Sequence, residues 1–132
     1  MSKHNKKIIL VVEDEEILTR TLKDKLEEES FNVLVAANGE IGLQLALKEH
    51  PDLILLDLLM PKVDGLTMLK KLREDSWGAK ANVIILTNVS DPDKVSEGMN
   101  IGPGGTYEYL IKSNWSLDDV VARVKQKLEI KD

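Results

Sequence analysis

Carboxylates stand directly after two apolar runs of this sequence. Glu13 and Asp14 follow the run from Ile8 to Val12, and Asp57 follows the run from Leu53 to Leu56. Such a carboxylate must be solvated, paired or bound to a cation, because moving it unpaired into an apolar site is very unfavourable. Carboxylates that gather at one point also repel one another unless a cation neutralises them. Oxygen-rich sites of this kind suit Mg²⁺, so the pattern indicates a magnesium site.

Two other residues with useful chemistry also end apolar runs. Thr87 follows the run from Val83 to Leu86, and Lys112 follows the run from Tyr107 to Ile111. A metal ion, an ammonium group and a hydroxyl group around a carboxylate form a receptor for a phosphoryl group. For each residue taken alone, a polar strand end is the simpler interpretation. Taken together, they favour a site for phosphoryl transfer.

The positions of these residues depend on the elements that carry them. Helical patterns separate five apolar runs of strand length, which are Ile8 to Val12, Asn32 to Ala36, Leu53 to Leu56, Val83 to Leu86 and Tyr107 to Ile111. Ser116 and Asp119 resemble a capping box at the start of the last helix. This alternation predicts an α/β fold, with a three-layer, doubly wound parallel five-stranded sheet and helices on both faces.

The strand order decides which strand ends meet. In the flavodoxin-like order 2-1-3-4-5, the first and third strands are neighbours, and ligands bind beyond their carboxyl ends. Glu13, Asp14 and Asp57 are therefore expected to converge on one crevice.

Length and composition limit what the site can belong to. The chain has 132 residues, of which 42% are hydrophobic and 31% charged, which is typical of one globular domain over residues 1–132. Its net charge of -5 argues against direct binding of nucleic acid. The apolar run after the basic start is too short for a signal peptide or a membrane span. With no cysteine in the chain, we expect a cytoplasmic protein without a membrane partner.

Four segments carry a family resemblance. They are VVEDEE, PDLILLDLLMPKVDGL, VIILTN and YLIKS, and they resemble the signature segments of the receiver domain of bacterial two-component response regulators. The resemblance extends from about Lys7 to Leu128 and implies a CheY-like receiver. We expect a stand-alone receiver with no output domain after Asp132.

The resemblance implies a role for each carboxylate. Asp57 corresponds to the phosphoacceptor, and Glu13 and Asp14 correspond to the acidic pair for Mg²⁺. Asp14 is expected to bind the ion directly and Glu13 through water. The backbone carbonyl of Leu59 is expected to be a further ligand.

The resemblance also implies a switch. Thr87 corresponds to the hydroxyl that moves toward the phosphoryl group, Lys112 to the phosphate-binding lysine, and Tyr109 to the aromatic residue that reorients on activation. The implied donor is the phosphohistidine of a sensor histidine kinase or of a histidine phosphotransfer protein. The downstream protein is unidentified. The sequence does not decide whether the signal is passed on by protein contact, by phosphorelay or by formation of a homodimer. We do not expect the chain to be an enzyme that turns over a separate substrate. It is expected to be a phosphoacceptor whose chemistry is limited to self-phosphorylation and self-dephosphorylation.

Several positions depart from the family pattern. Ser113 follows Lys112 where the family usually has proline, often after a cis bond, and the segment Gly102–Gly105 lengthens the connection to the fifth strand. The output face is therefore expected to be unusual. Leu59 and Val89 are apolar at positions that flank the path of a hydrolysing water, which predicts slow loss of the phosphoryl group.

Two other functions remain open. An aspartate-nucleophile phosphohydrolase also uses Mg²⁺ on a parallel sheet, but it needs an aspartate two residues after a first-strand nucleophile, where this chain has Glu16. A phosphorylation-independent binding module is the other alternative. The competent groups at all the expected site positions count against it.

Overall fold

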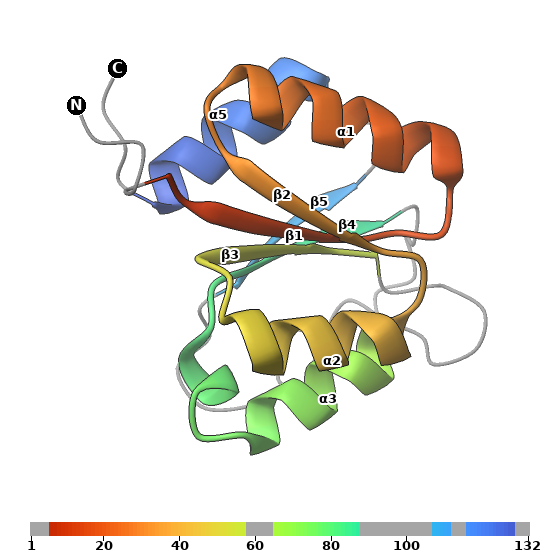
Figure 1. The fold of residues 1–132 in the computed structure, drawn as a ribbon, viewed down its shortest axis with the longest axis vertical. Coiled ribbons are helices and arrows are strands. Elements are labelled where there is room, and N and C mark those ends of the chain that lie inside the picture. The colour runs from red at the N-terminus through yellow and green to blue at the C-terminus, as the bar shows by residue number, and fades with distance from the viewer. Residues whose placement is uncertain (1–5, 58–64, 88–106, 112–115, 129–132) are drawn as a thin grey trace.

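The computed structural model describes residues 6–57, 65–87, 107–111 and 116–128. Strands and helices alternate along the chain as far as residue 87 (Figure 1). In chain order the elements are β1 (Ile8–Val12), α1 (Glu16–Glu28), β2 (Asn32–Ala36), α2 (Gly39–Glu49), β3 (Leu53–Leu56), α3 (Gly65–Glu74), the 3-10 helix η2 (Gly78–Lys80), β4 (Val83–Thr87), β5 (Tyr107–Ile111) and α5 (Leu117–Lys127). None of the helices in these ranges is long and apolar enough to cross a membrane.

The strands form one parallel sheet in the order β2-β1-β3-β4-β5, as predicted. Helices α1 and α5 cover one face, and α2 and α3 cover the other (Figure 1). Val12, the last residue of β1, pairs with Ala36 of β2 and with Leu56 of β3. The carboxyl ends of these three strands therefore lie at one level, which brings the residues that follow them close together.

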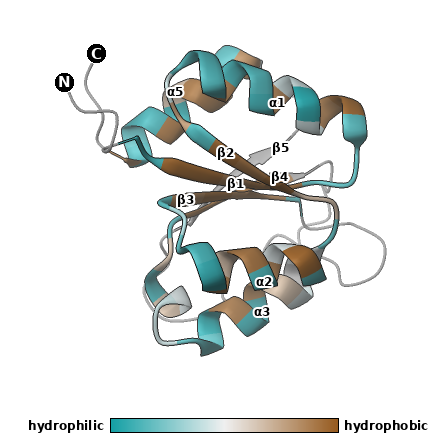
Figure 2. Ribbon diagram, in the orientation of Figure 1, coloured by the Kyte–Doolittle hydropathy of each residue, from teal (hydrophilic) through white to brown (hydrophobic). Residues whose placement is uncertain are grey.

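Alternation along the strands divides the core between the two faces of the sheet. In β1, Ile9 and Val11 pack in the cluster under α1 and α5, whereas Leu10 and Val12 pack in the cluster under α2 and α3. Figure 2 shows β1 and β3 as strongly hydrophobic. Full burial of one such side chain stabilises the fold by about 1.5 to 3 kcal/mol, so the strand ends are held on a rigid base.

Polar contacts fix the ends of the helices. The Oγ atom of Ser116 accepts a hydrogen bond from the N–H of Asp119 at 3.2 Å, and Oδ2 of Asp119 accepts one from the N–H of Ser116 at 2.9 Å. These two bonds confirm the predicted capping box. A pair between Lys125 Nζ and Glu29 Oε1 at 2.6 Å then links α5 to the end of α1.

Arg73 performs a similar role on the opposite face. Its side chain is buried, and Nη1 donates to the carbonyl oxygens of Gly78 at 2.8 Å and Ala81 at 2.9 Å. Both acceptors lie between α3 and β4, so one guanidinium group holds the connection that leads back into the sheet.

Candidate functional site

The parallel ladders continue one residue past β1 and β3. The N–H of Glu13 donates to the carbonyl of Ala36, and the N–H of Asp57 donates to the carbonyl of Val12, both at 3.0 Å. The backbone of each acidic residue is thus part of the sheet, although its side chain lies beyond the strand. These two bonds fix the main chain from which each carboxylate projects.

Three carboxylates come together at this edge of the sheet. Glu13, Asp14 and Asp57 each offer one carboxylate oxygen, and these oxygens all lie within 4.8 Å of one another. Glu13 and Asp57 are 3% and 5% exposed, whereas Asp14 is exposed. The predicted convergence of the three carboxylates is confirmed, and it brings two buried carboxylates together with one that is exposed to solvent.

This donor set fits a hard divalent cation. All three groups present oxygen, within 4.8 Å of one another, so one ion can be held among them by direct ligands and by bound water. Mg²⁺ usually keeps several waters and takes only a few carboxylates, and the exposure of Asp14 leaves an open side for such waters. Among the described residues, Glu13, Asp14 and Asp57 are therefore a group that could hold a metal ion.

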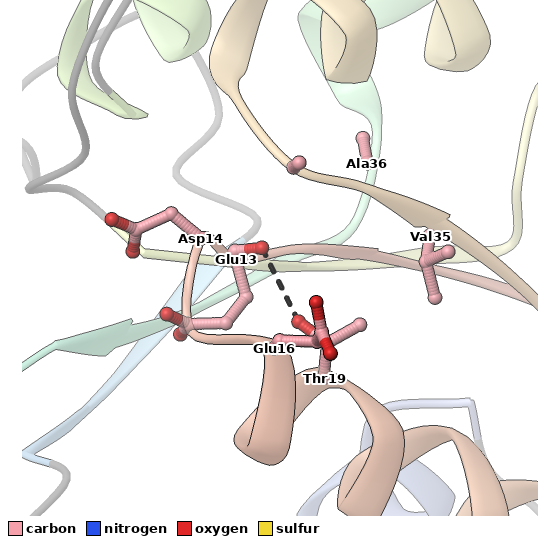
Figure 3. Close-up of a pocket in the computed structure, with 7 residues that line it drawn as sticks. Glu13, Asp14, Glu16, Thr19, Val35 and Ala36 are labelled. Carbon is pink, nitrogen blue, oxygen red and sulfur yellow. Dashed lines mark hydrogen bonds between the residues drawn. The ribbon is translucent and has the colours of Figure 1, made fainter.

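The turn between β1 and α1 shapes the cluster through two hydrogen bonds. Oε2 of Glu13 accepts from the N–H of Glu15 at 3.1 Å, so this carboxylate also binds the backbone just before α1. The hydroxyl of Thr19 donates to the carbonyl oxygen of Glu13 at 3.2 Å (Figure 3). The sequence analysis did not identify Thr19, because no motif marks a hydroxyl whose acceptor lies six residues earlier.

A pocket of about 160 Å³ adjoins the cluster. It is formed by the ends of β1 and β2 and the start of α1, and Figure 3 draws the residues that line it. Its lining comprises Glu13, Asp14, Glu16, Thr19, Val35, Ala36 and Ala37. Because Asp57 is not among these residues, the pocket lies on the β2 side of the cluster, away from β3.

Of the other predicted site residues, Thr87 lies at the same edge of the sheet, Tyr109 lies within a strand, and the rest fall outside the described residues. Thr87 is the last residue of β4, the neighbour of β3, and Tyr109 lies inside β5, paired with Ile85. Only the backbone of Thr87 and Tyr109 is described, so their roles in switching stay predictions. Leu59 and Lys112 lie outside the described residues, as do Asn88, Val89, Ser113 and the segment Gly102–Gly105.

Comparisons with known proteins agree with this architecture. The family model described as response regulator receiver domain matches residues 9–125. The response regulator ArlR of Staphylococcus aureus is 36% identical over 118 residues, which are 89% of this chain and 50% of ArlR. The chain spans about half the length of the curated relatives it matches.

Solved structures show the same arrangement of strands and helices. The receiver domain of the Francisella response regulator 1452 superposes with a TM-score of 0.81 at 30% identity, covering 93% of this chain and 97% of that one. A CheY-like response regulator receiver domain protein from Methanospirillum hungatei gives a TM-score of 0.85 at 26% identity, covering 95% of both chains. The similarity thus extends through nearly the whole chain.

Proposed function

This chain belongs to the response regulator receiver domain family, and from that premise we propose that Asp57 accepts a phosphoryl group at a site where Glu13, Asp14 and Asp57 bind Mg²⁺. The observation that carries the proposal is the convergence of the three carboxylates, within 4.8 Å of one another, beyond neighbouring parallel strands. Such a cluster provides both a nucleophile and a metal site in one place.

The position of Asp57 suits a nucleophile. Its backbone N–H is held by the carbonyl of Val12, and its side chain is buried at the end of a rigid strand. A carboxylate oxygen of Asp57 attacks phosphorus in line with the leaving group, so a P–O bond to Asp57 forms as the donor's bond breaks. When bound, the metal supplies positive charge that offsets the charge on the transferred oxygens.

The proposed donor is a phosphohistidine on a sensor histidine kinase or a histidine phosphotransfer protein. In that transfer the P–N bond breaks, and the released imidazole takes up a proton. Lys112 is proposed to contact the transferred group, and Thr87 to donate a hydrogen bond to it. A shift of Thr87 would favour a second packing of Tyr109, which changes the surface that an unidentified downstream protein or a second copy of the chain contacts.

A small phosphodonor tests the reaction without a kinase. We expect the protein, incubated with acetyl phosphate and Mg²⁺, to gain the mass of one phosphoryl group, and to gain none when EDTA removes the metal. Asp57→Asn should abolish the adduct. Asp24→Asn is the matched control, because Asp24 is an exposed aspartate in α1 and should leave the adduct intact.

Three outcomes separate the proposed function from its rivals. A stable single adduct that requires Asp57 supports the receiver. Continuous consumption of acetyl phosphate without an adduct would identify a phosphohydrolase. Neither adduct nor consumption would identify a module that acts without phosphorylation, and would refute the proposal.

A further inference from the structure

Asp14 differs from the other two carboxylates in how its backbone is held. The N–H groups of Glu13 and Asp57 extend the sheet ladders, whereas Asp14 lies in the turn between β1 and α1. Its position is therefore set by the two peptide groups that flank it. The carbonyl of the first is that of Glu13, and the N–H of the second is that of Glu15.

Each of these peptide groups has a defined hydrogen-bond partner. The Glu13 carbonyl accepts from the Thr19 hydroxyl at 3.2 Å, and the Glu15 N–H donates to Oε2 of Glu13 at 3.1 Å. The two bonds lie on opposite sides of Asp14 in the chain, and together they limit rotation of both adjoining peptide planes. Figure 3 shows Thr19 reaching from α1 to the carbonyl of Glu13.

We propose that Thr19 is a positioning residue for the metal site: its hydroxyl fixes the peptide that precedes Asp14, and so holds the Asp14 carboxylate in reach of Glu13 and Asp57. The inference rests on the proposed function and extends it to a residue outside the cluster. Outer contacts of this kind orient the groups that bind a metal and affect its affinity, even though they do not touch the ion.

The alternative is that the Thr19 hydroxyl only stabilises its own helix. Thr21 is an example of that purely local role. Its hydroxyl donates to the carbonyl of Ile17 at 2.7 Å, four residues back and within α1, as helical threonines often do. Thr19 already donates its own N–H to the Glu15 carbonyl in that helical pattern, at 2.9 Å. Its hydroxyl instead reaches back past the start of the helix to the end of β1.

The comparison of Thr19 with Thr21 defines the experiment. Thr19→Val removes the hydroxyl with little change in volume, Thr19→Ser retains the hydroxyl, and Thr21→Val removes the other hydroxyl of α1. Thr19→Ala is a second hydroxyl-free variant, should valine impair folding. Titration calorimetry with Mg²⁺ measures the affinity of each variant, and thermal unfolding without metal verifies that each is folded.

We expect Thr19→Val and Thr19→Ala to bind Mg²⁺ about three- to tenfold more weakly than the wild type, because one neutral hydrogen bond of moderate length orients the ligand. Thr19→Ser and Thr21→Val should bind as the wild type does. In amide NMR spectra, Mg²⁺ should shift the Asp14 and Glu15 resonances of Thr19→Val to the wild-type positions, but at a higher concentration. Phosphorylation by acetyl phosphate should return to the wild-type rate at saturating Mg²⁺.

The outcomes separate this inference from the function on which it rests. A wild-type protein that binds no Mg²⁺ would refute the proposed function, and the inference with it. A wild type that binds, together with a Thr19→Val variant that binds equally well, would overturn the inference alone. It would also be overturned if Thr19→Ser were as weak as Thr19→Val, or if Thr21→Val weakened binding to the same extent.

Discussion

Glu13 and Asp14 are neighbours in sequence, but the structure gives them different roles, and mutagenesis can distinguish these. Glu13 is 3% exposed and binds the backbone N–H of Glu15, whereas Asp14 is exposed. We predict that, in the metal-free protein, alanine at position 13 is less stable than the neutral amide there, whereas alanine and the neutral amide at position 14 are nearly equal in stability. Both alanine substitutions should remove the stabilisation that Mg²⁺ provides.

The expected change in the free energy of unfolding is worked out by comparing the alanine variant with the neutral amide variant at each position. Both variants lose the same negative charge, so the effect of the charge cancels in the comparison. Glu13→Gln keeps an acceptor for the Glu15 N–H, whereas Glu13→Ala removes this partly buried hydrogen bond, which costs about 0.5 to 1.5 kcal/mol. Loss of one buried methylene adds about 0.8 kcal/mol. Glu13→Ala should therefore be about 1.3 to 2.3 kcal/mol less stable than Glu13→Gln. At the exposed Asp14, alanine and asparagine should differ by about 0.5 kcal/mol or less.

Urea unfolding followed by circular dichroism, first in EDTA and then in Mg²⁺, measures both effects. A bound metal adds about 1.4 kcal/mol to the free energy of unfolding at ten times its dissociation constant, and this gain should be present only in the wild type. The reasoning is refuted if alanine and glutamine at position 13 are equally stable in EDTA. It is also refuted if Asp14→Ala is as destabilising as Glu13→Ala, since the bond to the turn would then have no energetic role.

Three further predictions concern the scaffold of the site. Arg73→Met should lower the free energy of unfolding by about 2 to 4 kcal/mol, because two buried carbonyls lose a charged donor; a loss below about 1 kcal/mol in urea unfolding would contradict this. In Gly42→Ala the new methyl group would lie 2.9 Å from Val12, so overpacking of about 1 to 3 kcal/mol should outweigh a gain of about 1 kcal/mol in helix propensity. The same substitution in a Val12→Ala background should be neutral or stabilising, and a strictly additive double-mutant cycle would refute the close contact. The rings of His50 and Trp77 are stacked, with their centroids 4.3 Å apart. A double-mutant cycle of His50→Asn with Trp77→Leu should therefore give a coupling energy of about 0.5 to 1.5 kcal/mol. Zero coupling would show that the stack does not stabilise the protein.

The strand order and the acidic cluster could be predicted because both depend on simple patterns. Uninterrupted apolar runs are typical of strands covered on both faces, and their alternation with helical patterns favours a parallel sheet. Once β1 and β3 are neighbours, the residues that follow them must be close, which places Glu13 and Asp57 together. This prediction required only that the carboxyl ends of β1 and β3 lie side by side. It did not require the conformation of the turn between β1 and α1.

The contacts around Asp14 could not be predicted in the same way. Whether Thr19 reaches the Glu13 carbonyl depends on the dihedral angles of the turn before α1, and these leave no periodic signal in the sequence. The second function of Glu13, as acceptor for the Glu15 N–H, was missed for the same reason. Sequence patterns report which face a residue occupies, but the direction of a single hydrogen bond is settled only by the folded backbone.

The site thus combines two kinds of support that should respond differently to mutation. Glu13 and Asp57 are tied to the sheet, so displacing either backbone would break a ladder bond beside the buried core. Asp14 is held by a turn whose two hydrogen bonds lie outside that core, and changes there can alter the placement of one carboxylate while the sheet stays intact. In the proposed metal site the affinity depends on all three oxygens, so we expect the turn between β1 and α1 to be where substitutions adjust the site without loss of the fold.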